Sequence, residues 1–199
     1  MIEFDKVTTR GGDWGESSLA SGERRRKDDL LFEMMGALDE LSSFLGLARA
    51  GCGTPSKSSP EGGPGGSELA DLIAGVQRTL LSIGAQVATP LRDPNDAKLH
   101  LVTDADVELL ESIEVHYLSK AKIGDKFILP GDSPLAGQLD VARAMCRRAE
   151  RRIVTCIRDR SMSELIPSQR YLNRLSDLLF VLARFVDTKE REAIQSDGA

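Results

Sequence analysis

Apolar residues recur at three- and four-residue spacing in five stretches of the chain, which is the period of an amphipathic helix. The first stretch begins near residue 28 and ends at Gly51. Its apolar positions are Leu30, Leu31, Met34, Met35, Leu38, Leu41, Leu45 and Ala48. A second helix is predicted over about 68–88, where Pro90 and Pro94 stop it.

The other three helices carry recognisable start signals. Asp104 is a plausible cap for a helix that continues to about Tyr117. Ser133 is predicted to cap a long helix that has Pro134 at its first position and runs to about residue 158. The last helix is predicted over about 168–189. Five amphipathic helices without a convincing alternating strand indicate an all-α protein, a five-helix bundle.

The segments between the helices have a different composition. Residues 1–27 are rich in Gly, Ser, Thr and charge, and we expect an ordered loop or a short extended segment there. Residues 51–68 contain six Gly, three Pro and four Ser, which favours a flexible connection between helices over a domain boundary. Residues 190–199 are expected to form a disordered tail. Residues 1–199 are therefore interpreted as one domain.

Charge and length exclude several classes of protein. The net charge of −5 argues against general nucleic-acid binding, and no apolar run approaches the roughly 20 residues of a membrane span. The N-terminus has no basic region followed by an apolar stretch, so it is not a secretory signal. The three cysteines, at 52, 146 and 156, have no CxxC spacing and are expected to be buried thiols of a cytoplasmic protein, or of a mitochondrial matrix protein if the chain is a mature eukaryotic one.

Two segments near the N-terminus could bind an anion. The segment TRGGDWGESS, residues 9–18, holds three glycines within five residues, which lets backbone N–H groups turn toward a ligand. It matches neither a Walker loop nor a dinucleotide fingerprint, and a plain surface turn is the alternative. Residues 23–29, ERRRKDD, could bind phosphates or could be a solvated helix start with Asp28 or Asp29 as the cap.

The strongest local feature is a row of arginines in the fourth helix. Residues 143–152 hold five arginines and one glutamate, and helical geometry places Arg143, Arg147, Glu150 and Arg151 on one stripe. Such a stripe needs carboxylate or phosphate partners, so surface ion pairs and an anion site remain equal alternatives. Asn173, on the last helix, offers both a donor and an acceptor.

Other candidate chemistry is weaker. Asp39 and Glu40 are adjacent and so point about 100° apart, which excludes a matched acid–base pair; Asp39 lies near the apolar stripe and would need a partner, such as an arginine. His100 and His116 have no metal-ligand spacing, so we expect no protein metal site, and no GxSxG motif supports hydrolase chemistry.

Taken in order, six segments resemble the PduO-type ATP:cob(I)alamin adenosyltransferase family. They are TRGGDWGESS (9–18), GERRRKDD (22–29), EMMGALDELSS (33–43), FILPG (127–131), RAMCRRAER (143–151) and YLNRLSD (171–177). Each segment alone is a modest signal, but six collinear matches over about residues 9–185 are hard to reach by chance. The chain departs from the family pattern at Gly11, Ala37 and Trp14, which could alter ATP affinity or loop rigidity.

The resemblance implies a homotrimer that binds ATP between neighbouring subunits and transfers its adenosyl group to reduced cobalamin. One subunit would hold ATP through Thr9, Arg10, Gly11, Gly12, Ser17, Ser18 and Lys27. The next would close the site through Arg147, Arg148, Ala149, Glu150, Arg151 and Asn173. Arg143 and Asp39 match a charge pair that bridges subunits near the corrinoid, and Phe127 matches an aromatic residue that faces the lower side of the cobalt.

The same resemblance implies a Mg²⁺ ion shared with ATP, and it implies a reductase and a B12-dependent mutase as partners. Two other classes remain open on the sequence. A non-catalytic carrier or regulator of the same fold would bind ATP or corrinoid without reaction. A helical interaction module would use the arginine stripe to grip acidic partners and would show no dependence on nucleotide.

Overall fold

The computed structural model describes residues 3–53, 66–89, 101–121, 123–124 and 127–187. Five long helices dominate it: α2 (Leu30–Gly51), α3 (Gly66–Ala88), α4 (Asp104–Leu118), α5 (Pro134–Arg160) and α6 (Ile166–Val186). A short helix, α1 (Phe4–Val7), precedes them, and a 3-10 turn (Ser163–Leu165) leads into α6. The predicted all-α five-helix bundle is confirmed.

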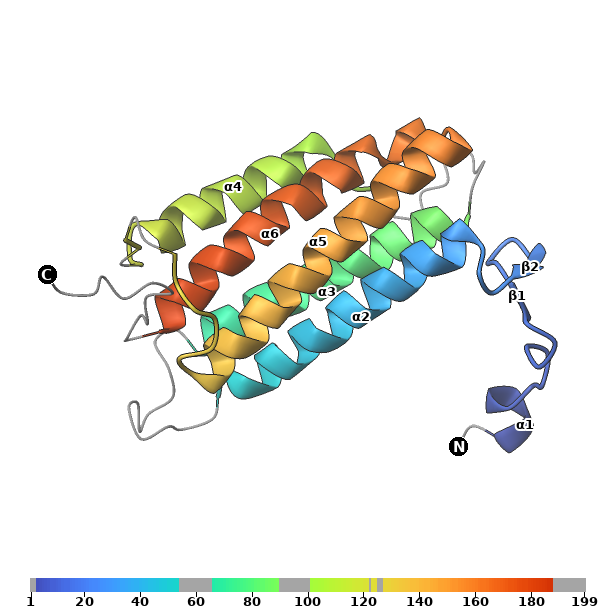
Figure 1. Ribbon diagram of the computed structural model, residues 1–199, viewed down its shortest axis with the longest axis horizontal. Coiled ribbons are helices and arrows are strands. Elements are labelled where there is room, and N and C mark those ends of the chain that lie inside the picture. The colour runs from blue at the N-terminus through green and yellow to red at the C-terminus, as the bar shows by residue number, and fades with distance from the viewer. Residues whose placement is uncertain (1–2, 54–65, 90–100, 122, 125–126, 188–199) are drawn as a thin grey trace, which may run out of the picture.

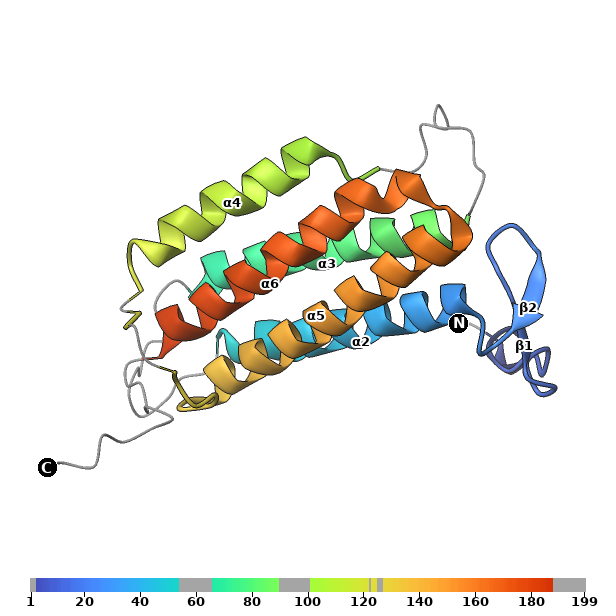
Figure 2. The same cartoon turned by 45° about the horizontal axis from the view of Figure 1, so that its top comes forward.

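The helices lie side by side as a bundle in which α5 packs between α2 and α6, α3 packs against α2, and α4 packs on the outer side of α6 (Figures 1 and 2). The predicted apolar stripes face one another in a continuous core. Leu41, Leu45, Ile83, Leu139 and Leu172 are all fully buried. Burial of each such side chain contributes about 1.5–3 kcal/mol.

Helix starts follow the local signals for the most part. Asp29 caps α2 by accepting a hydrogen bond from the Leu31 backbone N–H at 2.9 Å, and Ser133 caps α5 through the backbone N–H of Ala136. The prediction for Asp104 was wrong. The cap of α4 is Thr103, whose backbone N–H donates to the Asp106 carboxylate at 2.8 Å, because a carboxylate three residues into a helix can reach back to the capping residue.

Other helix ends differ slightly from the prediction. Helix α3 begins at Gly66, inside the segment predicted as a flexible connection, and α5 continues to Arg160 before Ser161 turns left-handed with φ 55°. Helix α6 begins at Ile166 and ends at Val186, since Asp187 is extended. Most of the predicted connection (54–65), the prolines at 90 and 94 and the predicted tail (190–199) lie outside the described residues.

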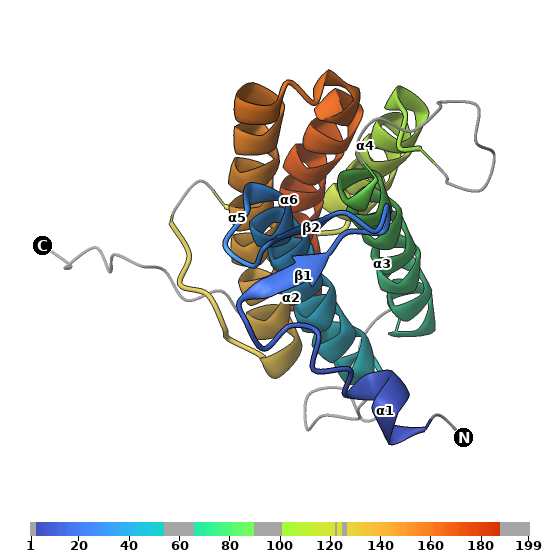
Figure 3. The same ribbon diagram turned by 90° about the vertical axis from the view of Figure 1, so that its right-hand side faces the viewer.

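The N-terminal region holds a small hairpin that the sequence did not reveal. Strand β1 (Glu16–Ser18) pairs antiparallel with β2 (Arg24–Arg26), with Ser17 opposite Arg25. Figure 3 shows this hairpin at one end of the bundle, beside the start of α2. Three-residue strands made of Glu, Ser and Arg have no apolar alternation, which is why a pattern search misses them.

The three cysteines are free and buried, as predicted. The Cys146 thiol donates to the Leu172 carbonyl at 3.1 Å and thereby joins α5 to α6, and burial raises the pKa of this thiol. Among the described residues, no helix is long and apolar enough to cross a membrane.

Candidate functional site

The glycine-rich loop folds as two consecutive tight turns. The Asp13 backbone N–H donates to the Arg10 carbonyl, and the Gly15 N–H donates to the Gly12 carbonyl, each at 3.3 Å. Arg10 and Gly15 both have positive φ, of 56° and 78°, so this backbone takes a conformation that glycine adopts at little cost. The loop therefore has a defined shape rather than an extended one.

Lys27 returns to this loop from the far side of the hairpin. Its backbone N–H donates to the Gly15 carbonyl at 2.8 Å, and a Cβ added to Gly12 would stand 2.8 Å from its Nζ. The predicted loop residues and Lys27 are thus brought together. Of the predicted serines, Ser17 is half-buried and Ser18 exposed on β1.

The arginines of the basic run are engaged with acceptors. Arg24 donates to the Gly11 carbonyl at 2.9 Å and to the Glu16 carboxylate, so it ties the glycine loop to β2. Arg25 pairs with Glu23 and Asp29, and Arg26 pairs with Asp28 at 2.6 Å. These contacts explain the basic run mainly as structural ion pairs.

Lys27 differs from its neighbours because its ammonium has no carboxylate partner among the described residues. Within the basic run it is therefore the cation that remains available to a ligand. The role of Arg24 as a clamp on the loop was not predicted, and the only sequence signal for it was its place in the basic run.

Asp29 joins the hairpin to the end of α5. Arg160 lies 2.9 Å and Arg25 3.4 Å from its carboxylate. Burial alone would raise the pKa of Asp29, but the Leu31 N–H and the two arginines together hold it below its ordinary value. This carboxylate therefore fixes the hairpin on the bundle.

The four arginines at positions 147, 148, 151 and 152 of α5 divide into two groups. Arg148 pairs with Glu40 at 2.8 Å and Arg152 with Glu33 at 3.1 Å, and both acidic partners lie on α2. Arg147 and Arg151 are exposed, and their guanidinium groups have no ion pair with any residue that the structure describes. The ion-pair alternative therefore holds for Arg148 and Arg152, while Arg147 and Arg151 stay candidates for an anion site.

Three of the remaining predicted residues lie in different surroundings. Ala149 is completely buried in the core, so its side chain is closed to a ligand. Arg143 lies with its guanidinium carbon 5.9 Å from the centre of the Phe180 ring, and its buried Nε has no hydrogen-bond partner among the described residues. Asp39 is exposed on α2, and no ion pair joins it to Arg143 within the described part of one chain.

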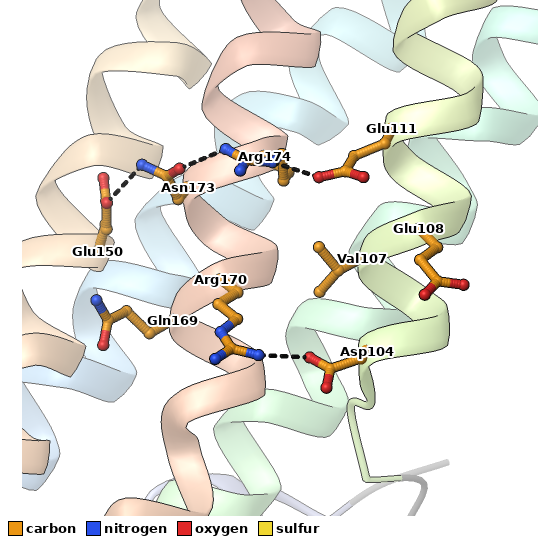
Figure 4. A pocket seen from close by; sticks show the side chains of 9 residues that line it. All are labelled: Asp104, Val107, Glu108, Glu111, Glu150, Gln169, Arg170, Asn173 and Arg174. Atoms are coloured by element: carbon orange, nitrogen blue, oxygen red, sulfur yellow. Dashed lines mark hydrogen bonds and ion pairs between the residues drawn. The ribbon is translucent and has the colours of Figure 1, made fainter.

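Glu150 and Asn173 meet across the α5–α6 contact at the edge of a groove of about 590 Å³ that also involves α4 (Figure 4). The Asn173 Nδ2 donates to Glu150 at 2.9 Å. On its other side the Asn173 Oδ1 accepts from Arg174 at 2.8 Å, and Arg174 also donates to Glu111 of α4 at 2.6 Å. Arg174 lies within the motif YLNRLSD, but neither Arg174 nor Glu111 was predicted as a site residue.

The glycine loop and the arginine stripe do not meet within one chain. Arg160 contacts Asp29 at the hairpin end of the bundle, and Arg147 lies thirteen positions earlier on the same helix. At a rise of 1.5 Å per residue, that separation is about 20 Å along the helix axis. Phe127 is 82% exposed and lies shortly before Pro134, at the end of α5 opposite to Arg160. The predicted residues thus form separate clusters, because the hairpin, the middle of α5 and the segment before α5 lie at different places along the bundle (Figure 1).

A sequence model of the cobalamin adenosyltransferase family matches residues 7–186. The chain belongs to this family. It is 38% identical over 184 residues to the corrinoid adenosyltransferase of Bacillus subtilis, with 92% of this chain and 88% of that relative covered. Its identity to the human corrinoid adenosyltransferase is 37% over 188 residues, covering 93% of this chain and 70% of the human protein.

Solved structures agree with this cobalamin adenosyltransferase assignment. A phenylalanine-to-alanine variant of a PduO-type ATP:corrinoid adenosyltransferase from Lactobacillus reuteri, complexed with cobalamin and ATP, matches with a TM-score of 0.78 and 26% identity over 96% of this chain and 99% of that one. An arginine-to-lysine variant complexed with ATP matches with a TM-score of 0.71 and 29% identity, covering 90% of this chain and 92% of that one. The resemblance stated from the six motifs is confirmed.

Proposed function

We propose that this chain transfers the 5′-adenosyl group of ATP to the cobalt of cob(I)alamin. A cobalt–carbon bond forms to C5′ while the C5′–oxygen bond breaks, and triphosphate leaves with the electron pair of that bond. Cob(I)alamin is itself a strong nucleophile, so the reaction needs no attacking side chain and no general base. The family match and the named activities of the relatives support this proposal.

The observation that carries the proposal is that Lys27 on one cluster and Arg147 and Arg151 on the other are cations without carboxylate partners among the described residues. Most of the arginines around them are paired. Triphosphate carries the negative charge that such unpaired cations attract, and they would stabilise it as it leaves. Thr9, Arg10, Gly11, Gly12, Ser17 and Ser18 would surround it on the side of Lys27.

The separation of about 20 Å between the two clusters supports a site shared between copies of the chain. The loop and Lys27 of one copy would face Arg147, Glu150, Arg151 and Asn173 of the next, in a homotrimer. Arg148 and Ala149 would contribute less directly, because Arg148 is paired with Glu40 and the Ala149 side chain is buried. Holding two reactants in line is worth roughly 7–11 kcal/mol in favourable cases.

Mg²⁺ would enter this site bound to the phosphates of the nucleotide. Among the residues that the structure describes, no group of three or more His, Cys, Asp or Glu side chains could hold a metal. Mg²⁺ is commonly bound through substrate phosphates and water with few protein ligands, and there it would offset phosphate charge. Lys27 and Arg147 act on the triphosphate whether or not that ion is present.

The corrinoid would bind near Phe127 and Arg143. The Phe127 ring is largely exposed, so it is free to pack against the lower side of the corrinoid and exclude an axial ligand there. A four-coordinate cob(II)alamin accepts an electron more easily, which a partner reductase would supply. The unpaired Nε of Arg143 and the exposed Asp39 suit an ion pair between copies of the chain. A B12-dependent mutase would receive the product.

The decisive experiment mixes the protein with cob(I)alamin and MgATP and follows the absorbance change of cobalt–carbon bond formation. Arg147→Ala should lower kcat/KM for ATP by about tenfold or more, since charged hydrogen bonds contribute about 1.5–3 kcal/mol. Arg158→Ala is the matched control, because Arg158 lies on the same helix but pairs with its neighbour Asp159. An unchanged ATP dependence in Arg147→Ala would refute the placement of Arg147.

Nucleotide binding can be measured separately from transfer. Trp14 is the single tryptophan of the chain, is 93% exposed and lines a pocket together with Lys27, so its fluorescence should respond to MgATP. A fluorescence response without formation of adenosylcobalamin would indicate the non-catalytic carrier. The absence of any nucleotide effect, on fluorescence or on thermal stability, would favour the interaction module and refute the proposed transfer.

A further inference from the structure

A continuous series of hydrogen bonds joins four side chains from three helices at the edge of the groove. Glu150 on α5 accepts from the Asn173 Nδ2, the Asn173 Oδ1 accepts from Arg174 Nη1, and Arg174 Nε donates to Glu111 on α4 (Figure 4). The three heavy-atom distances are 2.9, 2.8 and 2.6 Å. Arg174 also contacts the Asp177 carboxylate, which lies 3.6 Å from its Nη1 and one turn later on α6.

The chemistry of the two end groups dictates how the amide of Asn173 must point. A guanidinium has only donors, so it can meet only the amide oxygen. An ionised carboxylate has only acceptors, so it can meet only the amide nitrogen. An asparagine between Arg174 and Glu150 is therefore held in one orientation from both sides, whereas without Arg174 only the contact with Glu150 would hold it.

We propose that Arg174, anchored by Glu111, is a positioning residue that orients Asn173 and Glu150 for the nucleotide. The inference rests on the proposed function, because it takes Asn173 and Glu150 as ATP contacts. The Asn173 Nδ2 carries a second proton beyond the one that it donates to Glu150, and the Glu150 carboxylate has further acceptor capacity. A donor and an acceptor side by side suit the hydroxyl and amino groups of a nucleoside.

Stability alone does not account for this arrangement. The side chains of Arg174 and Glu111 are 41% and 48% exposed, and ion pairs exposed to that degree contribute little to folding. Helices α4 and α6 are also bridged one turn away by Arg170 and Asp104, at 3.0 Å. The distinctive feature of Arg174 is the second hydrogen bond, to Asn173.

The ion pair between Arg170 and Asp104 supplies a matched control for the experiment. Arg174→Met and Arg170→Met each remove an α6–α4 ion pair, but only Arg174→Met also removes a hydrogen bond to the amide of Asn173. Arg174→Met should raise the ATP dissociation constant about five- to tenfold, the effect of one lost hydrogen bond, as measured by Trp14 fluorescence. Arg170→Met should leave that constant within about twofold, and KM for the corrinoid should be unchanged in both.

A second comparison removes the acidic partners instead, which guards against misfolding of the arginine variants. Glu111→Ala should weaken ATP binding by a smaller factor in the same direction, whereas Asp104→Ala should not. In an Asn173→Ala background, Arg174→Met should have no further effect on ATP binding, because Arg174 acts through the side chain that is missing.

Equal effects of Arg174→Met and Arg170→Met, or additive effects of Arg174→Met and Asn173→Ala, would overturn the inference. Circular dichroism and thermal unfolding report whether each variant is folded. Failure of the unsubstituted chain to bind ATP would refute the proposed function and this inference with it. ATP binding that Arg174→Met leaves unchanged would refute the inference alone.

Discussion

Asp140→Ala should destabilise the fold strongly because it breaks a buried ion pair between α5 and α6. Arg184 Nη2 lies 2.7 Å from Asp140 and 3.8 Å from Asp187, and the three side chains are only 2%, 6% and 3% exposed. The guanidinium also lies 5.6 Å from the centre of the Phe180 ring. Its Nε has no hydrogen-bond partner among the described residues, so Asp140 is its principal support.

The size of the effect follows from the burial of the pair. Removal of one partner from a buried ion pair costs about 3–5 kcal/mol, because the other charge is left without compensation. Asp187 remains near Arg184, so we expect the lower end, about 3 kcal/mol. An unfolding entropy of about 2.1 cal/mol/K per residue gives roughly 0.4 kcal/mol/K for the 199 residues. The unfolding midpoint should therefore fall by about 7 °C.

The assays are urea unfolding for the free energy and thermal unfolding for the midpoint, both followed by circular dichroism at a fixed protein concentration, since an assembled protein has a concentration-dependent midpoint. The matched control is Glu33→Ala, which removes a partner of Arg152 from an ion pair whose side chains are both 41% exposed. That change should cost less than about 1 kcal/mol.

The double substitution Asp140→Leu with Arg184→Met should recover much of the loss, because a buried ion pair can be replaced by apolar side chains of similar volume. Equal costs for Asp140→Ala and Glu33→Ala would refute the reasoning, since burial would then not decide the contribution of the pair.

Three further changes test other parts of the molecule. Asp29→Asn should remove a contribution to stability that is fully present above the unfolded pKa of about 3.9. In the parent chain this contribution is lost as the pH falls through the depressed folded pKa of Asp29, so the stability of the variant should depend less on pH in acid. Phe127→Ala should slow adenosylation of cob(II)alamin plus a reductant. Rates equal to those of the parent chain, with cob(II)alamin and with pre-reduced substrate, would exclude the proposed role. Gly15→Ala forces a non-glycine residue to φ 78°, at a cost of about 1–2 kcal/mol, and should weaken ATP binding about five- to thirtyfold; Gly22→Ala, with φ 84° in the hairpin turn, is its control and should have a smaller effect.

The helices could be predicted because their signals are local. An apolar stripe, a cap such as Asp29 or Ser133, and a proline at the first helical position all act within a few residues of where they stand. Where a local signal was ambiguous the prediction was wrong by one residue, as at Asp104, whose neighbour Thr103 is the cap. The hairpin was missed because strands of three polar residues leave no periodic trace.

The family and its six motifs were also accessible from the sequence, because the order of residue types along the chain is the information that a motif carries. The chemistry suited to each segment followed in the same way: a glycine turn for an anion, and a row of arginines for phosphate or carboxylate.

Only the tertiary structure decided which of those charges are free. Arg148 and Arg152 are neutralised by Glu40 and Glu33, which lie more than a hundred positions earlier in the chain, whereas Arg147 and Arg151 on the same helix have no such partner in the part of the chain that the structure describes. Arg174 became part of the candidate site because α4 brings Glu111 to it. A charge is satisfied or exposed according to what packs beside it, and packing joins residues that the order of the chain keeps apart.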